Sequence, residues 1–444
     1  VISGNARFGV HITGSGTTDN RVTSNYIGTN GFGSSSTFNT VGVVIDSGAQ
    51  RNTVGGTIAG EGNLISGNRA QLFPYGAGVL IRGSGSDYNS IVGNAIGLDG
   101  GGTRALRNGS AGVIIAGGAR YNVIGGTSTA AANVISGNGS GELSVGIAAG
   151  VHIFGSGTSF NEVAGNRIGV TLSGLGVLAN AGHGIGIFGG ASDNIIGGDA
   201  PEAGNVITAS DYHGVYVNGL TTARNLIRYN SIYDNDSLGM ALANGAQHGV
   251  AAPVIMAASP DSATGNGAPA NGRVDIYRAA PDDFGRGEAL ALVGTGIANG
   301  SGEFAIALTG VTLADTLTAM AIDLENNSSA FSINRPADPS LDVEDSDEQL
   351  LPERFVLEQN YPNPFNPSTT ISYSLPVRSR VRLDIYNTLG QRVSTLASSE
   401  QPAGEYKAVW DGRSESGAPV ASGVYLYRLS TDNSSSQKKM LLLK

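Results

Sequence analysis

Glycine followed by alternating apolar residues recurs throughout the first half of the chain. Each copy has the form Gly-apolar-x-apolar, and successive copies start 30 to 38 residues apart. A period of two predicts a short β-strand whose apolar residues share one buried face, here Val10 and Ile12 in the first copy. The copies read GVHI from Gly9, GVVI from Gly42, GVLI from Gly78, GVII from Gly112, GVHI from Gly150, GIGI from Gly184 and GVYV from Gly214.

Two Asn residues follow every copy, and we call one such repeat a rung. The first Asn lies 10 or 11 residues after the glycine, and the second lies alternately 5 and 11 residues further on, so the full unit is a pair of rungs of 64 to 72 residues. Asn and Gly tolerate the left-handed backbone of tight turns, which predicts that these Asn residues open the second and third strands of a rung. The first Asn is Asn20, Asn52, Asn89, Asn122, Asn161, Asn194 or Asn225, and the second is Asn25, Asn63, Asn94, Asn133, Asn166, Asn205 or Asn230.

Three short strands per rung predict an all-β fold over residues 1–250, a parallel β-helix whose rungs stack about 4.8 Å apart. Repeat units such as GVHITGSGTTDNRVTSNYIG and GVHIFGSGTSFNEVAGNRIG resemble the right-handed parallel β-helix family. That family includes polysaccharide lyases and hydrolases, adhesins and passive surface rods. The resemblance therefore implies a fold without choosing an activity.

The pattern changes after residue 250. Residues 251–335 contain alternating segments such as RVDIYRA, GEFAIAL and DTLTAMAID, which predict a small β-sandwich that resembles the immunoglobulin-like modules of secreted bacterial proteins. Residues 336–353 are rich in acids and Pro, with five acids among the seven residues 342–348. Charge repulsion and Pro predict a solvated linker there.

Residues 354–444 show strand and turn signals at sandwich spacing, with Trp410 predicted to lie in the core. The order of motifs in this segment resembles the type A C-terminal sorting domain of the type IX secretion system. The residues that carry the resemblance are Asn360, Tyr361, Pro362, Asn363, Pro364, Phe365, Asn366, Pro367, Leu389, Gly390, Trp410, Asp411, Gly412, Gly423, Val424, Tyr425, Lys438 and Lys439.

This resemblance implies a cargo protein of a Gram-negative bacterium. Such a protein crosses the inner membrane by a signal peptide, passes through the periplasm, and has its sorting domain read by the outer-membrane machinery of type IX secretion. It is then released or anchored at the cell surface. Because the VISGN of residues 1–5 matches the ISGN at Ile65 and Ile135, the chain starts inside a rung, and we expect a signal peptide and further sequence upstream.

Composition and charge exclude several classes of partner and site. A net charge of −10, with Lys407 as the first Lys, excludes a nucleic-acid partner. The absence of Cys excludes disulfides, thiolate catalysis and Cys-ligated metals. The sequence contains no run of 18 apolar residues, so it predicts no transmembrane helix. Acids do not recur at one position on neighbouring rungs, so we expect no stacked calcium site, no other metal and no cofactor.

One polar cluster in the rod is a catalytic candidate. His183 and His213 both precede the repeat glycine on consecutive rungs, so we expect their rings to stack about 5 Å apart. Asp211 is close in sequence, and an imidazole with a carboxylate could do acid–base work on a glycan. The alternative interpretation is that these are ordinary surface residues near the end of the rod.

The outward position of the repeated strand is also informative. Val44, Leu80 and Ile114 occupy this position in the middle rungs, where a polar residue would be usual. Such an apolar row indicates that loops or a partner partly cover this face of the rod.

These observations favour a secreted or cell-surface protein that acts as an adhesin or glycan-binding stalk, with extracellular polysaccharide as its partner. The alternative is a β-helix polysaccharide lyase or glycoside hydrolase, and the second alternative is a structural component of a surface layer. An acidic cluster on one face would favour an enzyme, a row of exposed aromatic residues would favour sugar binding, and neither would favour a scaffold.

Overall fold

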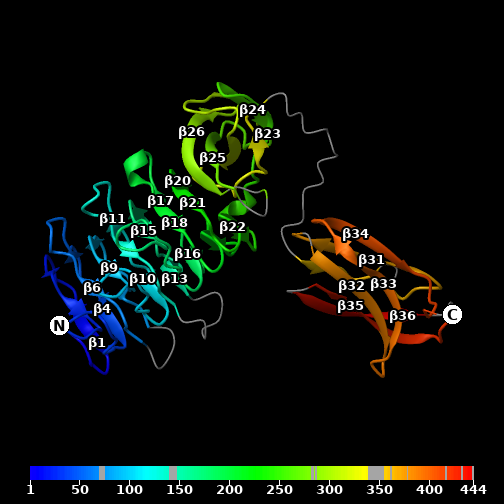
Figure 1. The fold of residues 1–444 in the computed structure, drawn as a ribbon, viewed down its shortest axis with the longest axis horizontal. Coiled ribbons are helices and arrows are strands. Elements are labelled where there is room, and N and C mark those ends of the chain that lie inside the picture. Colours follow the sequence, from blue (N-terminus) through cyan, green and yellow to red (C-terminus); the bar gives the residue numbers. More distant parts are fainter. Residues whose placement is uncertain are drawn as a thin grey trace. The chain divides into compact units, whose positions relative to one another are not determined.

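The structure, a computed structural model, describes residues 1–69, 76–139, 148–281, 285, 288–338, 355–360, 363–377, 379–415, 418–431 and 434–442. The chain divides into two compact units, Val1–Leu341 and Asp342–Lys444 (Figure 1). Within the described ranges the only helical segments are the short 3₁₀ turns η1 (Pro201–Ala203) and η2 (Ala246–Gly249). The predicted all-β fold is confirmed, since a β-solenoid is followed by immunoglobulin-like sandwich sheets.

Equivalent strands of successive rungs pair in parallel and in register, for example Val10 with Val43 and Ile12 with Ile45. Each rung gives one strand to each of three sheets. Sheet I contains β1 (Phe8–Thr13), β4 (Val41–Asp46), β7 (Val79–Arg82), β10 (Ala111–Ala116), β13 (Ala149–Phe154), β16 (His183–Phe188), β19 (Val215–Asn218) and β22 (Met240–Ala243). Sheet II contains β2 (Arg21–Val22), β5 (Thr53–Gly55), β8 (Ser90–Val92), β11 (Val123–Gly125), β14 (Glu162–Ala164), β17 (Ile195–Gly197) and β20 (Leu226–Arg228). Sheet III receives β3 (Tyr26–Ile27), β6 (Leu64–Ile65), β9 (Ala95–Ile96), β12 (Val134–Ile135), β15 (Arg167–Ile168), β18 (Val206–Thr208) and β21 (Ser231–Tyr233).

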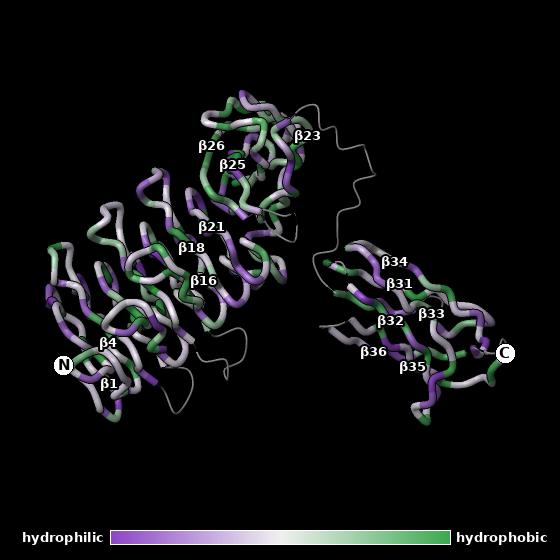
Figure 2. The backbone as a smooth tube through the Cα atoms, viewed as in Figure 1, coloured by the Kyte–Doolittle hydropathy of each residue, from purple (hydrophilic) through white to green (hydrophobic). Residues whose placement is uncertain are grey.

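The interior of the rod is a stack of Val and Ile side chains. Val43 and Ile45 of sheet I, Ile91 of sheet II and Ile65 of sheet III are all fully buried in one cluster. In Figure 2, strands of the rod such as β16 and β18 are coloured green, which marks hydrophobic residues. Because identical apolar residues lie directly above one another, burial of the alternating pattern stabilises every rung in the same way.

Asn residues stack in rows at the turns. In the row of first Asn residues, the Asn89 backbone N–H and side-chain Nδ2 both donate to Oδ1 of Asn122, at 2.9 and 3.0 Å. In the row of second Asn residues, Asn94 donates to Oδ1 of Asn133 in the same way, at 2.9 and 3.0 Å. Each amide therefore satisfies the polar groups of the preceding rung.

A third Asn row, which the sequence analysis did not identify, lies at the remaining turn. In this row Asn68 Nδ2 donates to Asn108 Oδ1 at 2.9 Å, and Asn108 Nδ2 donates to Asn138 Oδ1 at 2.9 Å. All three corners of the rod are thus closed by the same amide chemistry. The members of this row are Asn5, Asn39, Asn68, Asn108, Asn138 and Asn180.

The glycine of the repeated element is required by close packing. A Cβ added to Gly112 would lie 2.4 Å from Ile135 Cγ2 and 2.8 Å from the carbonyl oxygen of Gly150. A side chain there would collide with sheet III and with the next rung, so only Gly lets the two sheets meet at this corner.

The part of the first unit from β23 onward is a β-sandwich with its own apolar core. Its larger sheet is continuous with sheet III, because β26 pairs with β21 at Ile232 and Ala289. Pro336 pairs in β29 and Ala337 is fully buried, so these two residues belong to the sandwich rather than to the linker expected from residue 336. One sheet contains β23 (Val254–Ala258), β24 (Ser262–Asn266) and β27 (Phe304–Ala307), and the other contains β25 (Arg273–Ala279), β26 (Ala289–Ile297), β28 (Thr316–Ile322) and β29 (Arg335–Pro336).

The second unit is also a β-sandwich. Its core includes Trp410, which is 1% exposed, packed against Phe365 and Tyr425. The acidic segment predicted to be a linker lies outside the described residues. The first sheet contains β30 (Val356–Leu357), β31 (Thr369–Leu375) and β34 (Gly404–Trp410), and the second contains β33 (Arg392–Gln401), β32 (Ser379–Asn387), β35 (Gly423–Ser430) and β36 (Ser435–Leu442).

Candidate functional site

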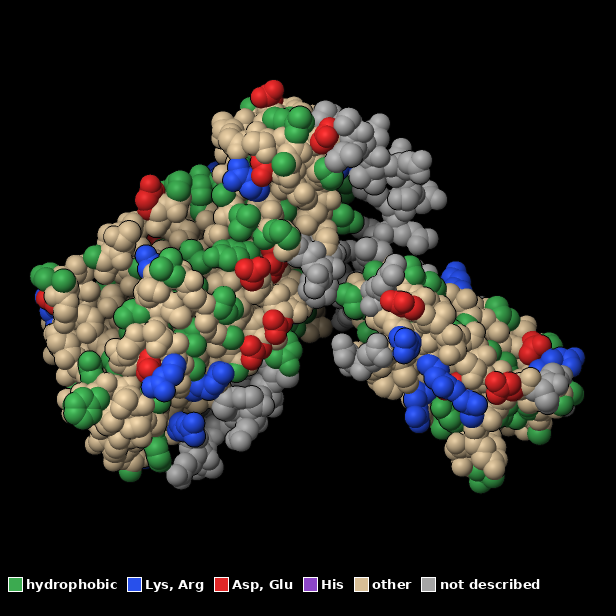
Figure 3. Space-filling view, in the orientation of Figure 1, with side chains coloured by type: hydrophobic (Ala, Val, Ile, Leu, Met, Phe, Trp, Pro, Cys, Tyr) green, Lys and Arg blue, Asp and Glu red, His purple; other side chains and the backbone are tan. Residues whose placement is uncertain are grey.

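The outer face of sheet I has an apolar centre. Val44, Leu80 and Ile114, the outward residues of three successive strands, are 0, 2 and 3% exposed. They form an apolar cluster separate from the rod interior. Charged side chains are sparse on the face of the rod seen in Figure 3. Because these three side chains are already buried within the chain, they form a second, smaller apolar core on the outside of sheet I.

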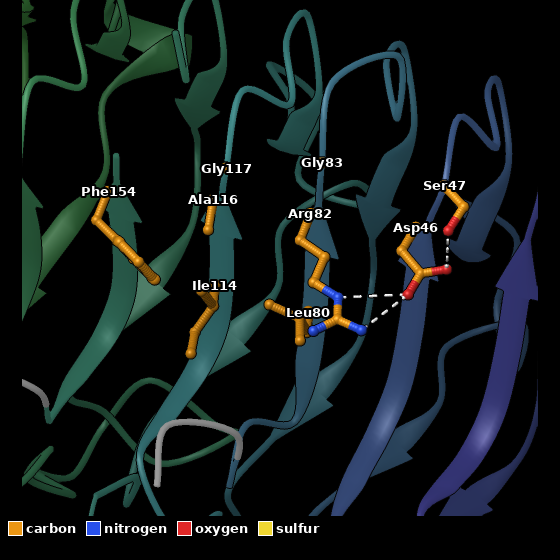
Figure 4. Close-up of a pocket in the computed structure, with 9 residues that line it drawn as sticks. All are labelled: Asp46, Ser47, Leu80, Arg82, Gly83, Ile114, Ala116, Gly117 and Phe154. Carbon is orange, nitrogen blue, oxygen red and sulfur yellow. Dashed lines mark hydrogen bonds and ion pairs between the residues drawn. The ribbon is translucent and has the colours of Figure 1, made fainter. Parts of the chain in front are cut away.

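A pocket of about 470 Å³ opens on this face. Leu80 and Ile114 lie along it, with Phe154 at one end and the Asp46–Arg82 pair at the other (Figure 4). Its residues come from four adjacent strands of sheet I, so the pocket follows the rod axis over about 14 Å. The complete lining is Asp46, Ser47, Leu80, Arg82, Gly83, Ile114, Ala116, Gly117 and Phe154.

The polar end of the pocket is built around the Asp46 carboxylate. It accepts hydrogen bonds from Thr13 Oγ1 at 2.6 Å and Arg82 Nη2 at 3.1 Å, and it lies 3.0 Å from His11 Nε2. Burial alone would raise the pKa of Asp46, but the hydrogen bonds from Thr13, His11 and Arg82 lower it to about 2. A carboxylate held ionised in this way is a poor proton carrier at neutral pH and a good fixed acceptor.

Beyond Phe154, histidine and aromatic rings cover the outer face of sheet I. The rings of His183 and His213 stack with centroids 5.5 Å apart and planes 6° apart. Tyr216 stacks on His183 at 4.5 Å, and Phe188 contacts His152 edge to face at 4.7 Å. The sequence register thus places the two candidate histidines as neighbours.

These imidazoles are buried and neutral. Burial lowers the pKa of His152 and of His213 to about 4, and burial together with the two neighbouring histidines lowers that of His183 to about 3. His152 Nε2, His183 Nδ1 and His213 Nδ1 are buried atoms that have no hydrogen-bond partner among the residues that the structure describes. The Leu238 backbone is a hydrogen-bond partner of His213, but neutral rings without an orienting carboxylate lack the arrangement of a general base.

Asp211 does not complete an acid–base pair. Its side chain is exposed, and within the described ranges it forms no hydrogen bond or ion pair with either imidazole. Partial loss of solvent around the carboxyl group, together with the nearby negative charge of Asp236, raises the pKa of Asp211. The structure therefore brings His183 and His213 together and leaves Asp211 apart from them.

An exposed aromatic row lies on the turn between sheets I and II, which sequence analysis missed. Tyr88 stacks on Tyr121 at 4.9 Å, and Tyr121 stacks on Phe160 at 5.1 Å, with planes within 8° of parallel. A signal was present, since each ring immediately precedes a first Asn of its rung. Sugars pack on open ring faces. Here the rings cover one another, so this row is a stabilising stack rather than a sugar platform.

The residues that resemble a sorting motif form a buried and an exposed group, with Gly423 and Lys438 half-buried between them. Asn360 is 2% exposed, and its backbone N–H donates to the Tyr427 hydroxyl at 2.9 Å. Leu389 is 81% exposed, and Lys439 is exposed on the last strand. Tyr361 and Pro362 lie outside the described residues. The buried group also includes Phe365, Trp410, Gly412 and Tyr425, and the exposed group also includes Asn363, Pro364, Asn366, Pro367, Gly390, Asp411 and Val424.

Asn363 links the two ends of the second unit. Its Oδ1 accepts a hydrogen bond from the backbone N–H of Leu441 at 2.9 Å, and Phe365 forms a parallel bridge with Leu442. The Asn-Pro-rich segment and the Lys438–Lys439 tail therefore lie side by side although about 75 residues separate them.

Across the described part of the chain, no three His, Asp or Glu side chains are grouped in a way that could hold a metal ion. No helix in those same ranges is long and apolar enough to cross a membrane.

Comparison with known proteins adds a family for the second unit. Residues 367–435 match the family model of the FlgD Ig-like domain, which identifies this segment as immunoglobulin-like. No curated protein matches the chain.

Three solved structures show low similarity. The BSP domain of a biofilm associated protein is 14% identical, with a TM-score of 0.15, over 44% of this chain and 29% of that one. Dimeric latent PorU from Porphyromonas gingivalis is 15% identical, with a TM-score of 0.18, over 43% and 20%. PorZ, an essential surface component of the type IX secretion system of Porphyromonas gingivalis, is 19% identical, with a TM-score of 0.16, over 38% and 16%. The chain spans less than a third of each of these proteins, and such TM-scores establish neither a shared fold nor a shared function.

Proposed function

We propose that this protein is a secreted or cell-surface adhesin of a Gram-negative bacterium that binds a glycan in the pocket on sheet I. The pocket itself is the observation that carries the proposal. It combines an apolar floor, an aromatic wall and a fixed ion pair along four rungs of a rigid sheet. Ligand sites typically combine these features, with few polar groups that set orientation.

The lining suits a saccharide. The apolar face of a sugar ring packs against Phe154, which is half-buried, as sugars do on aromatic surfaces. Hydroxyl groups of the same sugar reach the polar end, where Arg82 and Ser47 flank Asp46. A pocket elongated along the rod axis favours an oligosaccharide over a single sugar.

The C-terminal unit is the export signal in this proposal. The motif residues identified in the sequence support it, and their exposed group leaves Leu389 and Lys439 accessible to the outer-membrane machinery of type IX secretion. In the producing bacterium, removal of residues 354–444 is expected to leave the chain in the periplasm, as fractionation and immunoblotting would show. Surface display of the shortened chain would contradict this role.

An enzyme on the same surface would need a proton donor and an acceptor close together. On the described outer face of sheet I, His152, His183 and His213 have no carboxylate partner. His11 does lie 3.0 Å from Asp46, but Thr13 and Arg82 also bind that carboxylate and it stays ionised. Binding without turnover therefore agrees better with the geometry than a lyase or hydrolase does.

A glycan array probed with the full chain, followed by mass spectrometry of the glycans, tests this function. We expect binding without shortened or unsaturated products, and about tenfold weaker binding by Phe154→Ala, equivalent to about 1.4 kcal/mol. Phe160→Ala is the matched control, because it removes a Phe of the same rung outside the pocket. New products would support the enzyme instead, and no binding at all would favour a structural surface-layer role.

A further inference from the structure

The C-terminal end of a β-solenoid needs acceptors for the backbone N–H groups of its last rung. Within the stack, each Asn side chain supplies such an acceptor to the rung before it, as Asn225 does for Asn194 at 3.1 Å. The last rung has no further rung to supply these groups. Unpaired strand edges of this kind pair readily with other chains.

Two corners of the rod end on side chains that replace the missing next rung. One is the row of first Asn residues, which ends at Asn225, and the other is the third row, which continues past Asn180 through Ser210 to Asn235. The Asn225 backbone N–H donates to Gln247 Oε1 at 3.0 Å, where the following Asn would stand. At another corner, Asn235 donates its backbone N–H to Glu288 Oε1 at 2.9 Å. Asp234 N–H donates to the other oxygen of the same carboxylate at 2.5 Å. Glu288 belongs to the sandwich and is 3% exposed.

The sandwich also closes the end of sheet II. The Ile227 N–H donates to Ser328 Oγ at 2.9 Å, and that hydroxyl donates to the Ile227 carbonyl oxygen at 3.2 Å. The Arg224 N–H donates to Asn327 Oδ1 at 2.6 Å. These residues are about 100 positions apart in sequence, so the contacts are tertiary and specific to this junction.

A buried ion pair fixes the two parts together. Arg228 donates to both oxygens of Asp275, at 2.5 and 3.1 Å, and the two side chains are 6% and 0% exposed. Arg228 also contacts Asp199 at 2.9 Å, but that carboxylate is 73% exposed. A buried Arg left without its partner would be strongly unfavourable, whereas the exposed contact contributes little.

We infer that the sandwich is the end cap of the rod: it supplies side-chain acceptors in place of a next rung and thereby prevents a second copy of the chain from adding there. The interior contacts support this role, since Tyr277 and Phe331 of the sandwich pack into the same apolar cluster as the rod. The inference is independent of the proposed glycan site, which lies on other residues.

Two variants of the full chain separate capping from general stability. Asp275→Ala removes the buried partner of Arg228. Asp199→Ala, the matched control, removes only exposed contacts across the same junction, to Arg228 and to Arg273 of the sandwich, and such contacts contribute little. Hydrogen exchange measured by mass spectrometry on peptides covering 224–235 is expected to be about tenfold faster in Asp275→Ala, equivalent to a loss of about 1.4 kcal/mol. The control is expected to match the unmodified chain.

Sedimentation velocity on the same proteins tests the second half of the inference. We expect concentration-dependent association of Asp275→Ala and a single monomeric species for Asp199→Ala. Should Asp275→Ala fail to fold, the milder Ser328→Ala and Glu288→Gln variants take its place, with the same two readouts. Unchanged exchange at 224–235 would overturn the inference, and so would faster exchange in a chain that stays monomeric.

Discussion

Two sets of polar side chains stack along the rod with the same spacing and opposite chemical results. The Asn rows are buried and fully hydrogen-bonded, as Asn122 is with Asn89 and Asn161 at 2.9 to 3.0 Å. The histidines on the outer face of sheet I are also buried, but His183 Nδ1 and His152 Nε2 have no partner in the part of the chain that the structure describes. Stacking alone therefore does not stabilise a polar row.

The difference follows from the side-chain groups. An amide carries both a donor and an acceptor, and on adjacent rungs the donor of one lies beside the acceptor of the next. Imidazoles stacked face to face, as His183 and His213 are, direct their nitrogens sideways, so neither ring satisfies the other. The Asn rows thus stabilise the rod, while the histidine cluster costs free energy whenever it takes up a proton.

The largest effect should come from breaking an Asn row in its middle. Asn122→Ala removes the acceptor of Asn89 and leaves several buried polar groups unpaired. We expect the free energy of unfolding to fall by about 3 kcal/mol. Asn20→Ala is the control, because Asn20 lies at the exposed start of the same row. Urea denaturation measures both, and equal losses would mean that the rows do not carry the stability assigned to them.

The second-largest effect should be a loss of stability in acid, caused by protonation of the histidine cluster. With a folded-state pKa of about 3 against 6.5, His183 binds protons more readily in the unfolded chain. Stability should therefore be full above pH 6.5 and decline as the pH falls toward 3, with His183 contributing a loss of about 2 kcal/mol at pH 5.

Urea midpoints at pH 7 and pH 5 check this expectation. His183→Phe should reduce the loss between the two pH values. Asp99→Asn should leave it unchanged, because burial alone would raise the pKa of Asp99 but hydrogen bonds from Arg104 and Thr103 outweigh burial and hold that pKa below its usual value, outside that window. An identical pH dependence in His183→Phe would show that the cluster is not the source.

A smaller effect should distinguish the exposed aromatic stack from both polar rows. Tyr121 holds a left-handed backbone conformation, with φ of 56°, that only Gly adopts freely. Tyr121→Ala loses two ring contacts and keeps the strain, so we expect about 1 kcal/mol of destabilisation. Tyr121→Gly loses the same contacts and relieves the strain, and should be closer to the unmodified chain. A larger loss in the Gly variant would contradict this account.

Periodicity in the sequence was sufficient to predict the repeated parts of the structure. The period of two placed Val10 and Ile12 toward the interior, and the register placed His183 beside His213. The third Asn row was missed because its signal is irregular. Asn5, Asn68 and Asn138 are the last residue of an ISGN string, whereas Asn39, Asn108 and Asn180 are not.

Non-repeated contacts could not be predicted. The pairing of Arg228 with Asp275, and of Asp234 and Asn235 with Glu288, joins residues about 50 positions apart in elements of different pattern. Likewise, strand register fixed where His213 lies but not where the side chain of Asp211 points. Within the described residues Asp211 forms no hydrogen bond with either candidate histidine, while the pocket at Phe154, which draws on four rungs, could be identified only from the structure.

A rung adds little length for the residues it uses. Each rung takes 30 to 38 residues and extends the rod by one strand spacing of about 4.8 Å. The same residues in an extended Pro-rich segment would span roughly 100 Å, at about 3.1 Å each. A chain selected for distance alone would not be built this way. Stacked rungs instead enlarge a flat, rigid surface. Duplication of a two-rung unit would therefore increase the area available for binding more than the length of the rod.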